Sequence, residues 1–265
     1  MAISPKLLSL LRDPVGLEPL LLEGDTLVNA ASHRNYPVKD SIPILLNETE
    51  LGPQNVKIKK MYQWMAGGFD IANGIGNLLS LGGISKLRRQ LAASLGLKPG
   101  VRMLYTSIGT GLDLPFLAEQ LPLDTFELVG LDLSLEMLRK CQRKLRAYEK
   151  SSLLVQANAE RLPFGSGIFD VVLHVGGINQ FDRPAVAVQE MVRVAKPGVR
   201  ITIADETKGV VKSQYKKSPF TRSTFRNMPT DFDPRDWVPA GIRDAVYQEV
   251  AKGRIYFLTF TAPVQ

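Results

Sequence analysis

Residues 103–111 read MLYTSIGTG, a run of mostly apolar residues that ends in a turn with two glycines. The apolar part predicts a buried strand, and the residues after the turn predict a helix. Glycines at such a bend remove Cβ atoms that would keep a ligand away from the backbone, so peptide amides can meet a polar ligand. A Gly-x-Gly pair alone is equally typical of an ordinary turn, and the rest of the chain has to decide between the two.

The sequence around this turn alternates between predicted strands and helices. Strands are expected at 102–107, 126–132, 153–157, 170–175 and 200–205, and helices at 114–121, 135–148 and 184–194. Strands joined by helices of this length pair in parallel, and apolar runs such as VVLHV are typical of strands buried on both faces. Two β-rich runs joined at Lys252-Gly253 predict a terminal antiparallel hairpin. The fold class is therefore α/β, with a Rossmann-like, mostly parallel sheet.

An acidic residue, Asp132, ends the strand that follows the glycine turn, about 20 positions further along the chain. A carboxylate at this place in a Rossmann-like sheet can accept hydrogen bonds from both hydroxyls of a ribose. The turn and the carboxylate together favour an adenosine-type ligand.

Residues 98–205 resemble class I S-adenosylmethionine methyltransferases, most closely the ubiquinone/menaquinone C-methyltransferases with a methyltransferase type 11 domain. Four segments carry the resemblance in the family's order: LKPGVRMLYTSIGTGLDLPFLAEQ, LVGLDLSLEMLRKCQRK, QANAERLPFGSGIFDVVLHVGGINQF and AVQEMVRVAKPGVRITIADE. The resemblance implies a seven-stranded sheet, S-adenosylmethionine as the cofactor and methyl transfer to a small, apolar metabolite.

The expected cofactor-binding residues lie at the ends of the predicted strands: Tyr105, Ser107, Gly109, Gly111, Asp132, Leu133, Asn158, Ala159 and His174. The resemblance implies that the two glycines flank the methionine part of the cofactor, that Asp132 holds the ribose and that Leu133 contacts the adenine. Asn158 stands where the family usually has Asp, and its carbonyl oxygen can still accept a hydrogen bond from the adenine amino group.

The chain departs from the family's first motif at two positions. Tyr105 stands where the family has Asp or Glu, and Ser107 where it has Gly. The family's acidic residue helps to neutralise the ammonium of the cofactor, and Tyr105 offers a hydroxyl or an aromatic ring instead. This departure keeps open an alternative, a protein of the same fold with lost or altered, non-methylating chemistry.

His174 is the candidate general base, because it lies near the carboxyl end of its strand and its side-chain type accepts protons near neutral pH. The alternative is a hydrogen-bonded packing residue. Asp205 and Glu206 end the next strand and either orient an acceptor or cap the following segment. Three aromatic residues before the sheet form either a lid over an apolar acceptor or part of the core: Tyr62, Trp64 and Phe69.

The first 50 residues predict a small β-rich domain that resembles the zinc ribbons of methyltransferase activators. Residues 13–16 read DPVG where such ribbons have Cys-Pro-x-Cys, and Asn29 and Ser32 lie nearest to the second cysteine pair. Without thiolates no structural metal is expected, and packing against the main domain has to stabilise the small sheet. The expected division is 1–50 for this domain, 51–97 for a helical lead-in or lid and 98–265 for the cofactor-binding domain.

Amino-acid composition predicts the cellular compartment and the kinds of partner of the protein. The single cysteine, Cys141, and the absence of an apolar run long enough to span a bilayer predict a soluble protein of a reducing cytoplasm. The net charge is +7, with −3 on residues 1–56 and about +10 on the remainder. Basic clusters at 57–89 and 208–226 suit phosphates or an anionic membrane surface, or are simply solvated. No RNA-binding module is evident, so an RNA methyltransferase is the less favoured alternative, and the oligomeric state is not predicted.

Overall fold

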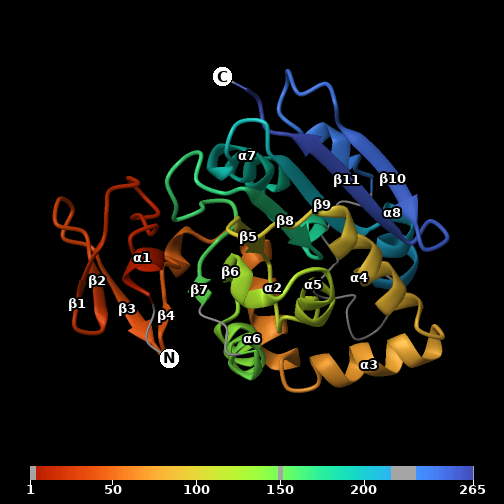
Figure 1. Ribbon diagram of the computed structural model, residues 1–265, viewed down its shortest axis with the longest axis horizontal. Coiled ribbons are helices and arrows are strands. Elements are labelled where there is room, and N and C mark those ends of the chain that lie inside the picture. Colours follow the sequence, from red (N-terminus) through yellow and green to blue (C-terminus); the bar gives the residue numbers. More distant parts are fainter. Residues whose placement is uncertain (1–3, 149–151, 216–230, 265) are drawn as a thin grey trace.

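A twisted central sheet with helices on both faces forms the body of the protein in the computed structural model, which describes residues 4–148, 152–215 and 231–264 (Figure 1). The sheet has seven strands: β5 (Arg102–Thr106), β6 (Glu127–Asp132), β7 (Ser152–Gln156), β8 (Val171–Val175), β9 (Arg200–Glu206), β10 (Val246–Val250) and β11 (Ile255–Thr261). The expected α/β class and seven-stranded sheet are confirmed, and the strand ends that were predicted from the sequence agree to within one residue.

The strand order is β10-β11-β9-β8-β5-β6-β7. Strands β5 to β9 pair in parallel, whereas β11 runs antiparallel to both β9 and β10, which confirms the terminal hairpin. Within this register Thr106 lies opposite Leu131 on one side and His174 on the other. The carboxyl ends of the central strands therefore meet at one edge of the sheet, where open parallel sheets bind their ligands.

Two apolar layers hold the helices against the sheet. One face packs against α7 (Pro184–Val194), and the other against α4 (Gly83–Ser94), α5 (Leu114–Gln120) and α6 (Leu135–Ala147). In α4 the spacing of Leu87 and Leu91 places both on the side that faces the second layer. The other helices are α1 (Pro5–Leu8), α2 (Pro53–Met65), α3 (Phe69–Leu79) and the short α8 (Lys208–Val210), which continues into a π-helical turn at Val211–Tyr215.

The N-terminal domain is a four-stranded antiparallel sheet of β1 (Leu21–Glu23), β2 (Thr26–Val28), β3 (Asn35–Lys39) and β4 (Ile42–Pro43). It lies against the β7 edge of the main sheet (Figure 1). The Leu45 amide donates to the Gln156 carbonyl at 2.9 Å, and Leu11 and Leu45 are buried in the same apolar layer as Phe164. The small sheet thus shares the core of the main domain, as the absence of thiolates required.

Hydrogen bonds join Asp13, Asn29 and Ser32, the positions at which the expected resemblance to a zinc ribbon would place cysteines. Asp13 Oδ2 accepts from Asn29 Nδ2 at 2.6 Å, and Oδ1 accepts from the Val15 amide at 2.7 Å and the Tyr36 hydroxyl at 3.1 Å. Asn29 Oδ1 in turn accepts from the Ser32 amide at 3.1 Å. Burial raises the pKa of Asp13, but the hydrogen bonds from these neighbours outweigh it and hold the pKa below 3.8.

Replacing Asp13 with alanine is expected to lower the free energy of unfolding by about 1–3 kcal/mol, because several buried donors lose their acceptor. The pKa of Asp13 is lower in the folded state than its ordinary value of 3.8. Its contribution to the free energy of unfolding is therefore complete above pH 3.8 and is lost as the pH falls through the folded-state pKa. Denaturant unfolding of Asp13→Ala, with the exposed Asp25→Ala as control, measures both effects. EDTA is expected to leave the wild-type midpoint unchanged, and a drop would show a structural metal.

Candidate cofactor and acceptor site

The turn after β5 adopts left-handed backbone conformations at Ser107 (φ 57°), Gly109 (φ 58°) and Gly111 (φ 73°). The two glycines serve different purposes. A Cβ atom on Gly109 would have no atom within 4 Å, so this side of the turn faces open space. A Cβ atom on Gly111 would lie 2.6 Å from Leu114 Cδ1 and 2.9 Å from Cys141 Sγ, so this glycine lets α5 and α6 pack closely.

Asp132 at the end of β6 is bound directly to the glycine turn. Its Oδ2 atom accepts a hydrogen bond from the Gly109 amide at 2.9 Å, and Oδ1 accepts from the Ser134 amide at 2.8 Å. Burial raises the pKa of Asp132 to about 6, although hydrogen bonds from Ser134, Gly109 and Leu133 act in the opposite direction. The two features that suggested an adenosine ligand from the sequence are therefore adjacent, and each carboxylate oxygen has a further lone pair to offer.

The residues expected near the adenine lie beside Asp132. The Leu133 carbonyl accepts from Gln156 Nε2 at 2.8 Å, which fixes the backbone after β6, and Ala159 is buried. Asn158 Oδ1 accepts from the Glu160 amide at 2.9 Å, so the oxygen expected to meet the adenine amino group already has one partner and keeps one lone pair.

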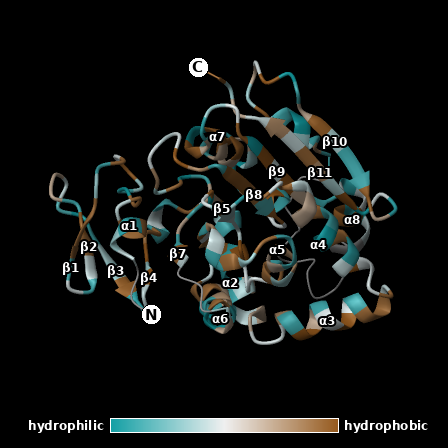
Figure 2. Cartoon of the chain, viewed as in Figure 1, coloured by the Kyte–Doolittle hydropathy of each residue, from teal (hydrophilic) through white to brown (hydrophobic). Residues whose placement is uncertain are grey.

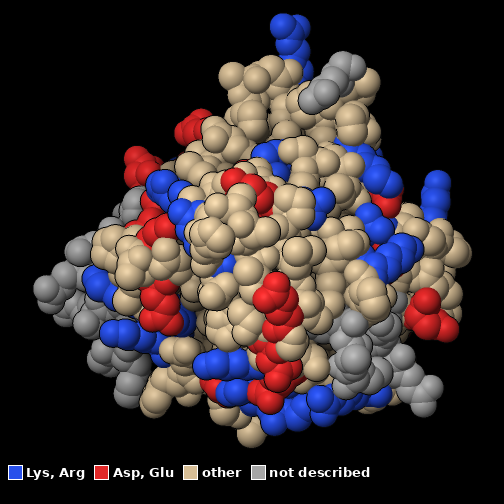
Figure 3. All heavy atoms as spheres, turned by 90° about the vertical axis from the view of Figure 1, so that its left-hand side faces the viewer, with Lys and Arg blue, Asp and Glu red and all other residues tan. Residues whose placement is uncertain are grey.

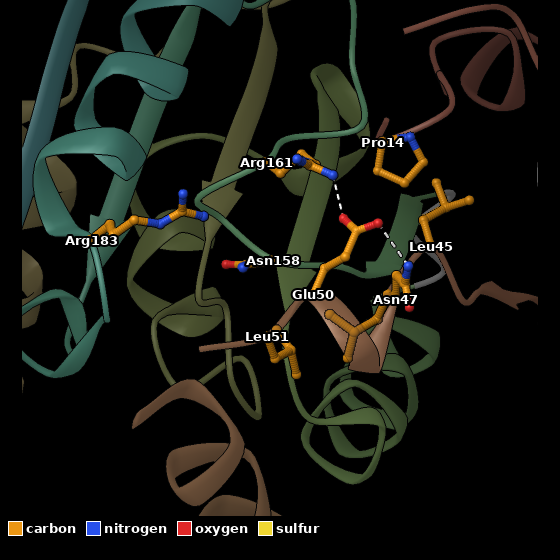
Figure 4. A pocket seen from close by; sticks show the side chains of 9 residues that line it. Pro14, Leu45, Asn47, Glu50, Leu51, Asn158, Arg161 and Arg183 are labelled. Atoms are coloured by element: carbon orange, nitrogen blue, oxygen red, sulfur yellow. Dashed lines mark hydrogen bonds and ion pairs between the residues drawn. The ribbon is translucent and has the colours of Figure 1, made fainter. Parts of the chain in front are cut away.

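Asn158 also lies on the wall of a shallow hollow, open to solvent, at the junction of the two domains (Figure 4). Glu50 reaches into this hollow, where it pairs with Arg161 and accepts from Asn47 Nδ2 at 2.8 Å. Arg183 borders the far side and pairs with the buried Glu160 at 3.0 Å. The N-terminal domain thus forms one wall of the space beside the expected adenine contacts.

Tyr105 is buried, and its hydroxyl is engaged inside the protein. It donates to Asp113 Oδ2 at 2.5 Å, while Arg88 donates to Asp113 Oδ1 at 2.6 Å. Burial and the neighbouring carboxylate raise the pKa of Tyr105 well above 10. No sequence pattern pointed to Asp113 or Arg88, because they come from the start of α5 and from α4 and meet Tyr105 through packing.

Replacing Tyr105 with phenylalanine is expected to lower the free energy of unfolding by about 1–2 kcal/mol, since Asp113 loses a buried donor. Thermal unfolding measures the loss, and the exposed Tyr148→Phe is the matched control. Because the hydroxyl is bonded to Asp113, cofactor affinity is expected to change little. A large loss of affinity with unchanged stability would place the hydroxyl on the cofactor instead.

The helical segment before the sheet is attached to the glycine turn through α3. Asp70, in the first turn of α3, accepts from the Thr110 hydroxyl at 2.5 Å and pairs with Lys144 of α6 at 2.9 Å. Lys140 donates to the Gly67 carbonyl at 2.9 Å. A movement of α3 would therefore displace the turn that carries Gly109.

His174 lies fully buried in β8, which is separated by β5 from the strand that ends at Asp132. Its Nδ1 atom is 2.9 Å from the Thr106 hydroxyl, and its ring meets Phe181 edge-on at 5.5 Å between centroids. Burial lowers the pKa of His174 to about 3, against the smaller opposing effect of a backbone hydrogen bond at Gly176. The ring is thus neutral at physiological pH.

A polar cluster that the sequence did not reveal lies at the same edge of the sheet, formed by Tyr62 of α2 and the segment after β8. The Tyr62 hydroxyl hydrogen-bonds with Gln180 and lies near Asp205 and Asp132. The Gln180 Oε1 atom is buried without a hydrogen-bond partner among the described residues. Burial and then Glu206 raise the pKa of Asp205 to about 7, although its oxygens accept backbone amides. The motif GINQF directly after a predicted strand was the available signal.

The aromatic residues before the sheet divide between two environments. Tyr62 and Phe69 contact each other edge-on, with ring centroids 6.0 Å apart, close to this polar cluster. Trp64 is 86% exposed and belongs neither to a lid nor to the core, so that expectation was wrong. It lies on the opposite side of α2, where helical geometry directs residues two positions apart away from each other.

Comparison with known proteins agrees with this geometry. The family model of the methyltransferase domain matches residues 104–203. Residues 104–203 of the chain are thus similar to a methyltransferase domain. A demethylmenaquinone methyltransferase of Renibacterium salmoninarum is 28% identical over 160 residues, and a ubiquinone/menaquinone biosynthesis C-methyltransferase of Pseudomonas aeruginosa is 32% identical over 170 residues. Each match covers 60% of this chain, and 63% and 64% of the relatives, so the chain spans less than two thirds of their length.

A solved structure shares the fold of the methyltransferase domain. The S-adenosylmethionine-dependent methyltransferase of Aquifex aeolicus superposes with a TM-score of 0.51 at 20% identity, over 66% of this chain and 89% of that one. S-adenosylmethionine is the cofactor of this family, and the residues present fit it. Gly109 faces open space, Asp132 presents a half-buried carboxylate beside it, and Gln180 holds a buried acceptor without a partner among the described residues.

Proposed function

We propose that the protein transfers a methyl group from S-adenosylmethionine to a small, apolar acceptor. The observation that carries this proposal is the hydrogen bond of 2.9 Å from the Gly109 amide to Asp132 Oδ2, which joins the ligand-facing turn and the ribose-type carboxylate at one edge of the sheet. When bound, the cofactor supplies an electrophilic methyl group on a sulfonium.

The chain's own residues then have to hold and align the reactants. Asp132 would accept the ribose hydroxyls with its remaining lone pairs, and the Gly109 side of the turn would admit the amino acid part without steric conflict. Leu133, Asn158 and Ala159 would surround the adenine, as the family resemblance implies. Alignment of acceptor and methyl supplies much of the acceleration of such a displacement.

The acceptor would lie at the carboxyl ends of β8 and β9, next to Tyr62 and Asp205. The names of the relatives, a demethylmenaquinone methyltransferase and a ubiquinone/menaquinone biosynthesis C-methyltransferase, make an apolar quinone precursor the first acceptor class to test. Helices α2, α3 and α4 precede the sheet, whereas residues 216–230, which include part of the basic cluster at 208–226, lie outside the described residues.

Calorimetry with S-adenosylmethionine and S-adenosylhomocysteine tests the cofactor assignment directly. Binding of both in a one-to-one ratio is expected, and an absence of binding at millimolar cofactor would remove the proposal. Transfer of a radiolabelled methyl group to a quinone precursor then tests the reaction separately from binding.

Two residues are proposed for proton removal, and their pH dependence distinguishes them. His174 is unprotonated at neutral pH but, with a pKa of about 3, is a weak base, whereas the Asp205 pKa of about 7 suits proton transfer near neutrality. The rate is therefore expected to rise with pH through about 7 in the wild type and in His174→Asn, and to lose this rise in Asp205→Asn. Loss of the ionisation in His174→Asn instead would assign the base to His174.

Tyr105 favours a second candidate, a cofactor-binding protein without methyl transfer. The strand end that carries the family's acidic residue holds a tyrosine here, and the nearby Asp113 is already paired with Arg88. The cofactor ammonium therefore meets no unpaired carboxylate from this strand. Cofactor binding without methyl transfer to any of a panel of apolar acceptors would support this candidate.

A further inference from the structure

Helix α3 presents its apolar face to the outside and its polar face to the protein. Asn77 Oδ1 accepts from the Ser85 amide at 2.9 Å, and Asp70 binds Thr110 and Lys144, so the inward contacts are polar. The outward side chains are spaced three and four residues apart along one face. They are all exposed and apolar: Ile71, Ile75, Leu78 and Leu79. This is the reverse of a surface helix in a globular protein.

Further apolar side chains flank this face at both ends. Trp64 precedes α3 and is 86% exposed, and Leu81 follows it and is 95% exposed. Figures 1 and 2 show α3 at the lower margin of the molecule, away from the central sheet. Exposed apolar patches of this kind mark a surface that is covered by another molecule or a membrane.

Positive charge lies next to the apolar face. Helix α6 carries one acidic and five basic side chains, two of which, Arg139 and Lys144, are held in ion pairs. The basic side chains are Arg139, Lys140, Arg143, Lys144 and Arg146. Lys140 and Lys144 contact the start of α3, and both helices lie at the lower margin in Figure 1. Figure 3 shows Lys and Arg side chains gathered along the same lower edge, seen from the side of the N-terminal domain.

We propose that α3 and α6 form a docking surface for an anionic lipid bilayer. The apolar face of α3 enters the interface between headgroups and acyl chains, and the basic side chains of α6 meet the anionic headgroups. Among the described residues no helix is long and apolar enough to cross a bilayer, so the contact is peripheral.

The positive charge of α6 favours a bilayer over a second copy of this chain as the partner that covers the apolar face of α3. A second copy docked through α3 would bring two sets of α6 charges close together around the apolar contact, which costs free energy. An anionic membrane neutralises the same charges. Because Asp70 links α3 to Thr110 of the glycine turn, the docked helix lies directly beside the candidate site, where an apolar acceptor dissolved in the membrane would be delivered.

Flotation of the full-length protein with vesicles tests this surface without cofactor, so the result is independent of the proposed methyl transfer. Vesicles of phosphatidylcholine alone are compared with vesicles that also contain phosphatidylglycerol. Wild-type protein is expected to bind the anionic vesicles at least about tenfold more tightly, because each basic side chain near the surface contributes about fivefold.

Two double variants separate the apolar and the electrostatic contributions to vesicle binding. Ile75→Glu with Leu79→Glu is expected to weaken binding at least about tenfold by placing charge in the interface, and Arg143→Glu with Arg146→Glu is expected to abolish the preference for anionic vesicles. All four side chains are exposed, so the fold is retained, and Leu21→Glu on the N-terminal sheet is the matched control.

Several outcomes would overturn the docking proposal. One is that the wild type binds neither kind of vesicle. Another is that Leu21→Glu and the α3 variant lose binding equally. A third outcome is an oligomer of the wild type in light scattering that Ile75→Glu with Leu79→Glu disperses without changing vesicle binding. That result would assign the apolar face of α3 to contact between copies of the chain.

Discussion

Asp132→Ala is expected to weaken the binding of S-adenosylmethionine about 5- to 150-fold, the equivalent of about 1–3 kcal/mol. The carboxylate lies at the end of β6, bound by the Gly109 and Ser134 amides, and its remaining lone pairs are the ribose acceptors in the proposal. Its removal leaves the ribose hydroxyls without acceptors and the Gly109 amide without its partner. Calorimetric titration measures the change.

The pKa of Asp132 adds a second expectation for the same titration. Because the ribose hydroxyls donate to the charged form, affinity is expected to be constant well above pH 6 and to fall as the pH drops through about 6. Asp132→Ala is expected to lose this pH dependence. Asp124→Ala, at an exposed position of the same domain, is the matched control and keeps wild-type affinity. Wild-type affinity in Asp132→Ala would refute the ribose assignment.

Gly111→Ala is expected to lower the free energy of unfolding by about 2–4 kcal/mol. The new methyl group would lie 2.6 Å from Leu114 Cδ1 and 2.9 Å from Cys141 Sγ, in a layer where both neighbours are buried, and at a φ of 73° that L residues rarely adopt. Denaturant unfolding measures the loss.

The control for this substitution is Gly67→Ala, where the added atom has no neighbour within 4 Å and φ is not positive. It is expected to stay within about 0.5 kcal/mol of the wild type, as exposed substitutions usually do. Equal losses in the two variants would mean that backbone flexibility, rather than the packing of α5 and α6, explains the Gly111 effect.

The candidate site divides into a part that local sequence predicts and a part that it does not. The glycine turn and Asp132 were found because each follows directly on a predicted strand, and the parallel sheet brings strand ends together without further information. Gln180 and Asp113 were not assigned, and the choice between lid and core stayed open for Tyr62, because their roles come from contacts between elements far apart in the chain. Asp13, Asn29 and Ser32 stand between these cases, since the resemblance to a zinc ribbon singled out their positions and the structure shows that hydrogen bonds join them.

The sequence by itself determined the α/β fold, the order of strands and helices along the chain and the sheet edge proposed for the ligand, because hydrophobic periodicity and turn residues act over a few positions. The tertiary structure decided the direction of each apolar face and the partner of each buried polar group. The spacing of Ile71, Ile75 and Leu79 shows that they share a face of α3, but periodicity is the same whether that face meets the core or the outside. Packing settles the direction, and here it turned the apolar face outward.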